Sequence, residues 1–392
     1  MRVALVYDLV YPYSKGGVEK RISDLARLLS ARGHETHIFG TRLWDGEPDR
    51  VEDGVSFHGI CEPVDTHSRG GRRSVWQAAR FAMVAASAIA RYDFDVVEVQ
   101  GMTPITCLAI LVRCRFTTMT PVVIWYEVWR EYWNEYLGAL GYVGRLVEWL
   151  VARLAPVSAA VSLLPASRLK EWGVEDVSML PIGIDYHRIQ TVAPDVLRSE
   201  VIYVGRLAPH KNLELLIDAV SLLRAEGMTP RVLIVGEGPE REGLERRAKS
   251  KDLDNLRFLG RLESDDQVVS LMKSARVFAF PSLREGFGLA PLEAGASGLP
   301  VVAVRHPDNA TCELIEDGFN GLVTASDPRD FANALKKLLS DGGTRDAMGQ
   351  RARDAAEAYD WTHVVSAVED FYLEATLRHA RHAPTGSGRR PE

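Results

Sequence analysis

The sequence contains few cysteines, no long apolar run and no strong net charge. Its 392 residues include four cysteines, which are Cys61, Cys107, Cys114 and Cys312. This spacing matches neither paired zinc ligands nor a redox motif, so we expect reduced thiols in a cytoplasmic protein. The net charge is −6, from 47 basic and 53 acidic residues. Because no excess of positive charge is present, we expect no binding of nucleic acid.

The apolar stretches are too short to span a bilayer. Residues 81–90 and 101–112 each stop before an arginine, short of the roughly 18 to 20 residues that a spanning helix needs. The apolar opening at residues 3–7 runs into Asp8, which indicates a first strand and no secretory leader. Residues 379–392 mix proline, glycine, serine and arginine without periodicity, and this composition predicts a disordered tail.

Strand and helix patterns alternate twice along the chain, which is long enough for two cores of ordinary size. The first half predicts strands at residues 2–7, 34–39, 96–99, 122–126, 157–161 and 177–180, with helices after Gly16-Gly17 and at 74–91, 144–154 and 163–172. A turn-rich segment at residues 181–185 precedes a second set of strands that starts at Val201. This alternation predicts an α/β protein with parallel sheets.

A turn with two cations follows the strand that starts at Val201. Arg206 and Lys211 lie after the carboxyl end of this strand and before an amphipathic helix. Open parallel sheets bind ligands at that edge, and both side chains suit phosphate oxygens. For Lys211 alone, a solvated lysine at a helix start is the alternative.

A strand, a loop and a helix recur at residues 279–294. Pro291 suits a first helical position, so the amides of Gly288 and Leu289 are expected at a helix N-terminus, where they favour an anion such as phosphate. Glu285 and Glu293 bracket this start with seven residues between them. For Glu293 alone, capping of the helix is the alternative interpretation.

Four motifs occur here in one order. They are Gly205-Arg206-Leu207 with Lys211-Asn212, then Val235-Gly236-Glu237-Gly238-Pro239, then Pro281-Ser282 before Glu285-Gly286-Phe287-Gly288-Leu289, and finally Glu293. This series resembles the nucleotide-binding half of the retaining GT4-type glycosyltransferases (group 1), and the resemblance extends from Met1 to about Asp370. It implies a GT-B fold, in which two Rossmann-like doubly wound domains face each other across a cleft. The expected domains are residues 1–184 on the acceptor side and 185–360 for the nucleotide sugar, with a helix at about 361–378 packed back on the first.

The resemblance also implies roles for individual residues. Arg206 and Lys211 would hold the diphosphate and stabilise the departing nucleotide, and Glu285 would contact the donor sugar. The remaining donor contacts would come from Gly16 and Gly17, the backbone of Arg261 and Leu262 at the base, the amides of Phe287, Gly288 and Leu289, and Glu293 at the ribose. A plain turn is the alternative for the two N-terminal glycines. The scheme needs no metal or cofactor besides the substrate, a UDP- or GDP-sugar.

The sequence departs from the family at one strand end. Many relatives carry a histidine there, whereas this chain has Tyr126-Glu127, which we take as acceptor-side candidates. Asp93 and Asp95 match a metal-binding pattern, but an ordinary helix-to-strand turn is the favoured interpretation. The histidines at positions 34, 37 and 58 lack mutual ligand spacing and are expected to be structural.

These features predict transfer of a hexose, with retention, from a nucleoside diphosphate sugar to an acceptor hydroxyl. The alternatives are a sugar-nucleotide epimerase of related architecture and a non-catalytic nucleotide-sugar-binding protein. Dense aromatics at residues 125–136, a cationic loop at 69–73 and apolar helices at 74–112 suggest a lipid-linked or cell-envelope glycan as acceptor, met at the inner face of the cell membrane. A soluble acceptor and a merely solvated loop remain open.

Overall fold

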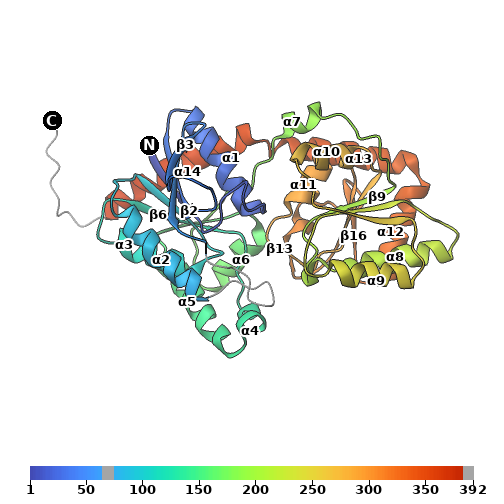
Figure 1. Cartoon of the computed structure of the whole chain (residues 1–392), viewed down its shortest axis with the longest axis horizontal. Helices are drawn as coiled ribbons and strands as arrows, with labels where there is room; N and C mark the ends of the chain where they lie inside the picture. The colour runs from blue at the N-terminus through green and yellow to red at the C-terminus, as the bar shows by residue number, and fades with distance from the viewer. Residues whose placement is uncertain (64–74, 383–392) are drawn as a thin grey trace. The chain divides into compact units, whose positions relative to one another are not determined.

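The computed structural model describes residues 1–63 and 75–382. The chain forms two compact units, one of Met1–Leu180 with Val365–Glu392 and one of Pro181–Val364 (Figure 1). From the sequence, the chain was predicted to pass into the second unit after residue 184 and back into the first after residue 360. Helix α14 runs from Trp361 to His382, so the expectation of a disordered tail is wrong for residues 379–382. The rest of that tail and the loop at 69–73 lie outside the described residues.

The first unit is built on an eight-stranded sheet in the order β3-β4-β2-β1-β5-β6-β7-β8. Its strands are β1 Arg2–Val6, β2 Glu35–Thr41, β3 Asp49–Glu52, β4 Val55–Cys61, β5 Val96–Gln100, β6 Thr120–Trp125, β7 Val157–Ala160 and β8 Val177–Met179. All neighbours are parallel except β3 and β4. Strands β3 and β4 were not predicted. Strand β3 is a largely exposed edge strand with three charged residues and no apolar alternation.

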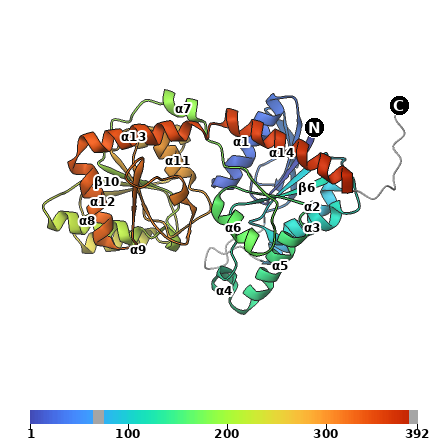
Figure 2. The same ribbon diagram turned by 180° about the vertical axis from the view of Figure 1, so that it is seen from behind.

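Helices cover this sheet, as Figure 2 shows from behind. They are α1 Gly17–Ala31, α2 Val75–Ile89, α3 Pro104–Cys114, α4 Tyr132–Leu137, α5 Gly141–Leu154, α6 Leu163–Glu171 and most of α14. Helix α3 packs against both α2 and α5. Their inward stripes share one apolar core, which includes Phe81, Ile110 and Val151. Burial of these stripes, more than helix propensity, stabilises the three helices.

The second unit contains a fully parallel six-stranded sheet in the order β11-β10-β9-β12-β14-β16. Its strands are β9 Val201–Val204, β10 Val232–Val235, β11 Leu256–Gly260, β12 Val277–Phe280, β14 Val301–Val304 and β16 Gly321–Thr324, with a short pair β13 Arg284–Glu285 and β15 Asp308–Asn309. The helices are α7 Tyr186–Thr191, α8 Leu213–Ala225, α9 Arg241–Ser250, α10 Asp265–Lys273, α11 Leu289–Ala296, α12 Pro328–Ser340 and α13 Gly342–Glu357, with 3₁₀ turns η1 Gly138–Leu140 in the first unit and η2 Pro209–Lys211 and η3 Ala310–Glu313 here. Both units confirm the predicted doubly wound α/β fold.

Within the described ranges, every helix is either too short or too polar to cross a bilayer.

Candidate functional site

Four loops meet at the carboxyl edge of the six-stranded sheet, where β9, β10, β11 and β12 end. Leu207 N–H donates to the Glu237 carbonyl over 2.9 Å, so the loops after β9 and β10 lie against each other. Gly236 has a φ of 135°, and a Cβ there would lie 1.9 Å from the Gly205 carbonyl oxygen. Only glycine fits this approach. The glycine motif after β10 therefore shapes the turn that carries Arg206.

Lys211 and Glu285 form the central ion pair of this edge. The Lys211 ammonium donates to a Glu285 carboxylate oxygen, and the Ser282 hydroxyl donates to the same oxygen over 3.1 Å. Each of the two charged side chains is 15% exposed. The structure thus brings together two residues that lie 74 positions apart, both singled out by the sequence. Because they are half-buried and reachable, they can exchange this pairing for contacts with a ligand.

Further positive charge gathers around His210, which precedes Lys211. Burial lowers the pKa of the His210 imidazole most, and three neighbouring cations lower it further, from 6.5 to about 4. These cations are Lys211, Arg284 and Arg206. Arg284 and His210 were not among the site residues predicted from the sequence. Their spatial closeness could not be read from spacing, since β13 reaches the β9 loop only through tertiary packing. The edge is suited to an anion.

The depressed pKa of His210 predicts a stability loss in acid. Between pH 6.5 and about 4 the unfolded chain binds a proton that the folded chain does not, so stability falls as the pH falls through this window. We expect the wild type to lose about 2 kcal/mol from this group between pH 7.5 and 5, and His210→Gln to lack this component. Urea unfolding of both proteins at the two pH values measures the difference. Equal pH dependence of the two proteins would contradict the assignment.

Helix α11 starts at this edge with a left-handed cap. Gly288 has φ 102° and ψ 56°, and a Cβ there would lie 2.6 Å from the Thr311 hydroxyl oxygen. The helix begins at Leu289, so Pro291 is its third residue, and the expectation that it would be the first is wrong. Leu292 N–H makes the first helical bond, to the Gly288 carbonyl over 3.1 Å. The amides of the first turn therefore lack intrahelical partners and can meet an anion.

Glu293 lies beyond the first turn of α11. No acidic residue occupies that turn, so a capping box, which needs an acidic or amide side chain at the third position, does not explain Glu293. The carboxylate is half-buried in the second turn. Its predicted contact with a ribose stays a prediction.

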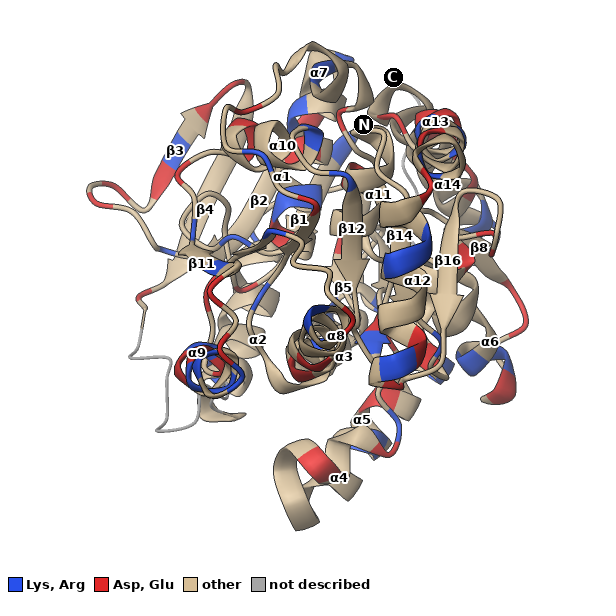
Figure 3. Cartoon of the chain, turned by 90° about the vertical axis from the view of Figure 1, so that its right-hand side faces the viewer, with Lys and Arg blue, Asp and Glu red and all other residues tan. Residues whose placement is uncertain are grey.

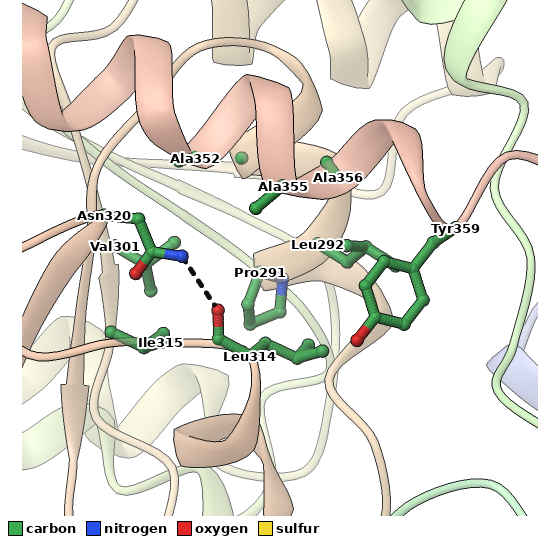
Figure 4. A pocket seen from close by; sticks show the side chains of 11 residues that line it. Pro291, Leu292, Val301, Leu314, Ile315, Asn320, Ala352, Ala355, Ala356 and Tyr359 are labelled. Atoms are coloured by element: carbon green, nitrogen blue, oxygen red, sulfur yellow. Dashed lines mark hydrogen bonds between the residues drawn. The ribbon is translucent and has the colours of Figure 1, made fainter. Parts of the chain in front are cut away.

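The opposite side of α11 packs on α13. Here a small hollow is lined by Pro291, Leu292 and Gly295 of α11, by Ala352, Ala355 and Ala356 of α13, and by Val301, Leu314, Ile315, Asn320 and Tyr359 (Figure 4). Asn320 donates its side-chain amide to the Leu314 carbonyl over 3.1 Å. The hollow is mainly apolar and contains no acid or base other than the Tyr359 phenol. We therefore interpret the hollow as part of the packing of α11 on α13.

Arg261 and Leu262 follow β11 at the same edge. Gly236 N–H donates to the Gly260 carbonyl over 2.8 Å, which places the loop after β11 beside the loop after β10. Arg261 is exposed and Leu262 packs partly on the core. The backbone of both residues can face a planar ligand, and the predicted contact with a base stays a prediction.

In the first unit, Gly16 and Gly17 start helix α1. Gly16 is the N-cap in extended conformation, and a Cβ there would lie 2.4 Å from a Glu19 carboxylate oxygen. Ser14 donates its hydroxyl to Glu19 over 2.8 Å. A side chain at position 16 would therefore displace the Glu19 carboxylate, and the helix start remains a candidate anion contact.

Tyr126 points into the first unit. Its side chain is 5% exposed, and its hydroxyl donates to the Gln100 side chain over 3.0 Å. Burial raises the pKa of the phenol above its usual value. Contact of Tyr126 with a substrate stays a prediction, and in this structure its hydroxyl is already engaged. Glu127 is half-buried at the strand end and is the more accessible of the two.

The aromatic side chains after β6 pack on one another and on helix α5. Trp129 contacts the rings of Tyr132, Trp133 and Tyr136 at centroid distances of 4.7–5.3 Å. Glu148 of α5 is 1% exposed and ties this cluster to the helix. It accepts from Trp129 N–H over 2.7 Å and from Trp133 Nε1–H over 3.0 Å. The solvent-facing apolar side chains lie instead on α5, which the sequence analysis overlooked.

Replacing Glu148 with glutamine is expected to loosen this cluster. The variant leaves buried donors without a carboxylate and introduces a competing N–H, at a cost of about 1–3 kcal/mol. Chemical denaturation measures the loss. Glu131→Gln, which affects an exposed pair with Arg145, is the matched control and should cost less than about 1 kcal/mol. Equal losses in both variants would show that Glu148 has no special role.

The weaker polar candidates have structural partners. Arg2 N–H donates to Asp95 over 2.8 Å at the start of β1. This contact therefore lies at the amino end of the strand, away from the carboxyl edge of the sheet. His37 and His58 lie 2.9 Å apart between Nδ1 and Nε2, a contact that depends on the unpredicted strand β4. Among the described residues, no group of three or more histidine, cysteine or acidic side chains is arranged to hold a metal ion.

Two family models match the chain. One, described as glycosyl transferases group 1, matches residues 193–355, and the other, described as glycosyltransferase family 4, matches residues 15–188.

Curated relatives align with part of the chain. It is 36% identical over 199 residues to a D-inositol 3-phosphate glycosyltransferase of Corynebacterium kroppenstedtii, covering 48% of this chain and 43% of the relative. It is 32% identical over 225 residues to a sulfoquinovosyl transferase of Arabidopsis thaliana, covering 56% and 42%. The chain thus spans less than half the length of these relatives.

Solved structures share the fold over nearly the whole chain. Sucrose-phosphate synthase from Thermosynechococcus elongatus has a TM-score of 0.79 at 17% identity, covering 95% of this chain and 98% of that one. Anabaena HepE in complex with UDP-glucose has a TM-score of 0.74 at 18% identity, covering 95% and 100%. At this identity the likeness concerns the fold alone.

Proposed function

Because this chain belongs to the GT4-type, group 1 glycosyltransferases with the GT-B fold, we propose that it transfers a hexose from a nucleoside diphosphate sugar to an acceptor hydroxyl. The observation that carries this proposal is the carboxyl edge of the six-stranded sheet. There the Lys211–Glu285 pair lies among further cations, and α11 begins with unpaired amides in the same unit. A cationic edge that also carries the Glu285 carboxylate suits a diphosphate joined to a sugar.

The proposed chemistry develops charge on the diphosphate. As the bond from the anomeric carbon to the diphosphate oxygen breaks, negative charge grows on the leaving oxygens. Arg206, Lys211 and the amides of Phe287, Gly288 and Leu289 would stabilise it, since prearranged donors lower such a barrier. Glu285 would leave its ion pair to hold the sugar hydroxyls. Glu293 would hold the ribose.

Retention at the anomeric carbon is part of the proposal. The acceptor hydroxyl would attack from the face that the diphosphate leaves, forming the new glycosidic bond while its proton passes to a phosphate oxygen of the donor. This scheme requires no covalent intermediate with the protein. It also requires no metal, because side-chain cations and a helix start supply the positive charge.

The proposed donor is a UDP- or GDP-sugar and the proposed acceptor a lipid-linked or cell-envelope glycan. Anabaena HepE was solved in complex with UDP and with UDP-glucose, which favours the uridine nucleotide for the first trials. One relative named above is called a sulfoquinovosyl transferase and the other a D-inositol 3-phosphate glycosyltransferase, so sequence similarity alone does not select one acceptor. The location proposed is the cytoplasmic side of the cell membrane.

Product analysis tests the function. The protein is incubated with UDP-, GDP- and ADP-sugars, a lipid extract and EDTA, and the products are identified by mass spectrometry and by the anomeric proton signal. The expected product is a glycosylated acceptor of retained configuration, formed despite EDTA. An altered free sugar would identify an epimerase, and nucleotide binding without turnover would identify a binding protein.

A further inference from the structure

Helices α2, α3 and α5 of the first unit present apolar side chains on the sides that face away from the sheet. Trp76 and Met83 of α2, Phe116 after α3, and Tyr142, Leu146 and Trp149 of α5 are 40–84% exposed. On α5 these residues recur at helical spacing, opposite to the buried Glu148, Val151 and Ala152. We call this surface the α2/α3/α5 face. Large apolar side chains gathered on neighbouring elements mark an interaction site.

The three helices form one layer. Helix α3 packs between α2 and α5, and their inward sides share a single core. Both Figure 1 and Figure 2 show α4 and the start of α5 extending beyond the sheet of this unit. The exposed apolar side chains are therefore carried by packed helices, except for Phe116, which lies in the turn after α3.

Exposed charge on these helices is of one sign. Their arginines are Arg80, Arg113, Arg145 and Arg153, and Arg115 follows α3, whereas Glu148 is the one acidic residue and is 1% exposed. Arg145 pairs with Glu131 outside the helices, so it contributes little. The whole protein has a net charge of −6, which makes this cationic face distinctive. Helix α9, for comparison, carries both signs around its surface, as an ordinary solvated helix does (Figure 3).

We propose that the α2/α3/α5 face docks on the surface of an anionic lipid bilayer. Tryptophan, tyrosine and leucine side chains enter the interface between headgroups and acyl chains, and arginines attract anionic headgroups. A second copy of this chain fits less well, because a self-contact would bring arginines together without an exposed carboxylate on these helices to pair with them. Docking would bring the enzyme to a lipid-linked acceptor, and in this respect the inference rests on the proposed function. Lipid binding itself does not depend on turnover.

Vesicle flotation of the purified full chain tests the proposal. The wild type is expected to float with vesicles of phosphatidylcholine and phosphatidylglycerol in equal parts, and to float at least about tenfold less with phosphatidylcholine alone. The double variant Leu146→Glu/Trp149→Glu is expected to lose about tenfold or more in partitioning. Controls are Val51→Glu and Val196→Glu, at side chains that are 70% and 97% exposed elsewhere. They should bind as the wild type does.

Three results would overturn the docking surface: no flotation of the wild type, undiminished flotation of the double variant, or equal binding to both kinds of vesicle. A wild-type dimer in sedimentation that the double variant dissolves would assign the face to a second copy instead. Thermal unfolding checks that the variant folds, and Arg80→Gln/Arg115→Gln, which keeps the apolar face, should lose selectivity for the anionic vesicles. Donor hydrolysis in detergent is measured in parallel. Flotation without any turnover would reject the proposed function and keep the surface.

Discussion

Replacing Lys211 with methionine is expected to lower kcat by about 100-fold to 1000-fold. The ammonium would no longer neutralise charge on the departing diphosphate, and removal of one such donor typically costs this much. The Glu285 carboxylate would also remain unpaired next to the donor phosphates and repel them, so KM should rise. Initial rates with the active donor of the panel, at several concentrations, separate the two effects.

The Lys211 variant needs controls for charge and for folding. Lys249→Met removes the same group from an exposed position on α9 and should leave both constants unchanged. Glu285→Gln should lower kcat while KM changes less, because the amide can still contact sugar hydroxyls. Thermal unfolding of each variant confirms that the unit is intact. Wild-type rates in Lys211→Met would remove this residue from the mechanism.

Replacing Arg21 with methionine is expected to destabilise the first unit by about 3–5 kcal/mol, since it leaves a buried carboxylate unpaired. Arg21 of α1 donates to Glu98 of β5 over 2.6 Å, and the two side chains are 1% and 0% exposed. Tyr372 of α14 also donates to Glu98, over 2.6 Å. Burial raises the pKa of Glu98, but the pairing with Arg21 more than offsets this, so the pKa lies below its usual range. Denaturant unfolding measures the loss.

The matched variant is Arg21→Met/Glu98→Leu. It removes both charges, so it should recover much of the lost stability, as buried pairs often do when replaced by apolar residues. A double variant that is less stable than Arg21→Met alone would show that Glu98 contributes mainly through Tyr372 and Gln100. The network would then be a polar anchor for α14 rather than an ion pair.

Local signals in the sequence account for much of the fold. Glycines with positive φ at positions 236 and 288 lie where the motifs put turns, and the parallel sheets follow from alternating strands and helices. Strand β3 and helix α4 were missed because neither has a buried apolar face, so their sequences show no periodic pattern of apolar residues. The start of α11 was misplaced by two residues, since proline tolerates any position in the first turn.

The site was harder to predict where it depends on distant segments. Lys211 and Glu285 were named from separate motifs, but their direct pairing, and the gathering of Arg284 near His210, arise from tertiary packing. Tyr126 was predicted as the last residue of a strand, whereas β6 ends one residue earlier, and alternation along a strand does not predict whether the residue after it is buried. Its burial depends on Gln100 and on the network around Glu98. The exposed side of α5 escaped notice because its apolar residues resembled core.

Backbone hydrogen exchange with and without saturating UDP or GDP tests the central claim most directly. If the donor diphosphate binds at the carboxyl edge of the six-stranded sheet, amides at residues 205–212 and 285–290 should exchange at least about tenfold more slowly with nucleotide. Residues 241–250 of α9, on the same unit, should be unchanged. Protection confined to other segments, with none at these two loops despite bound nucleotide, would contradict the assignment of the site.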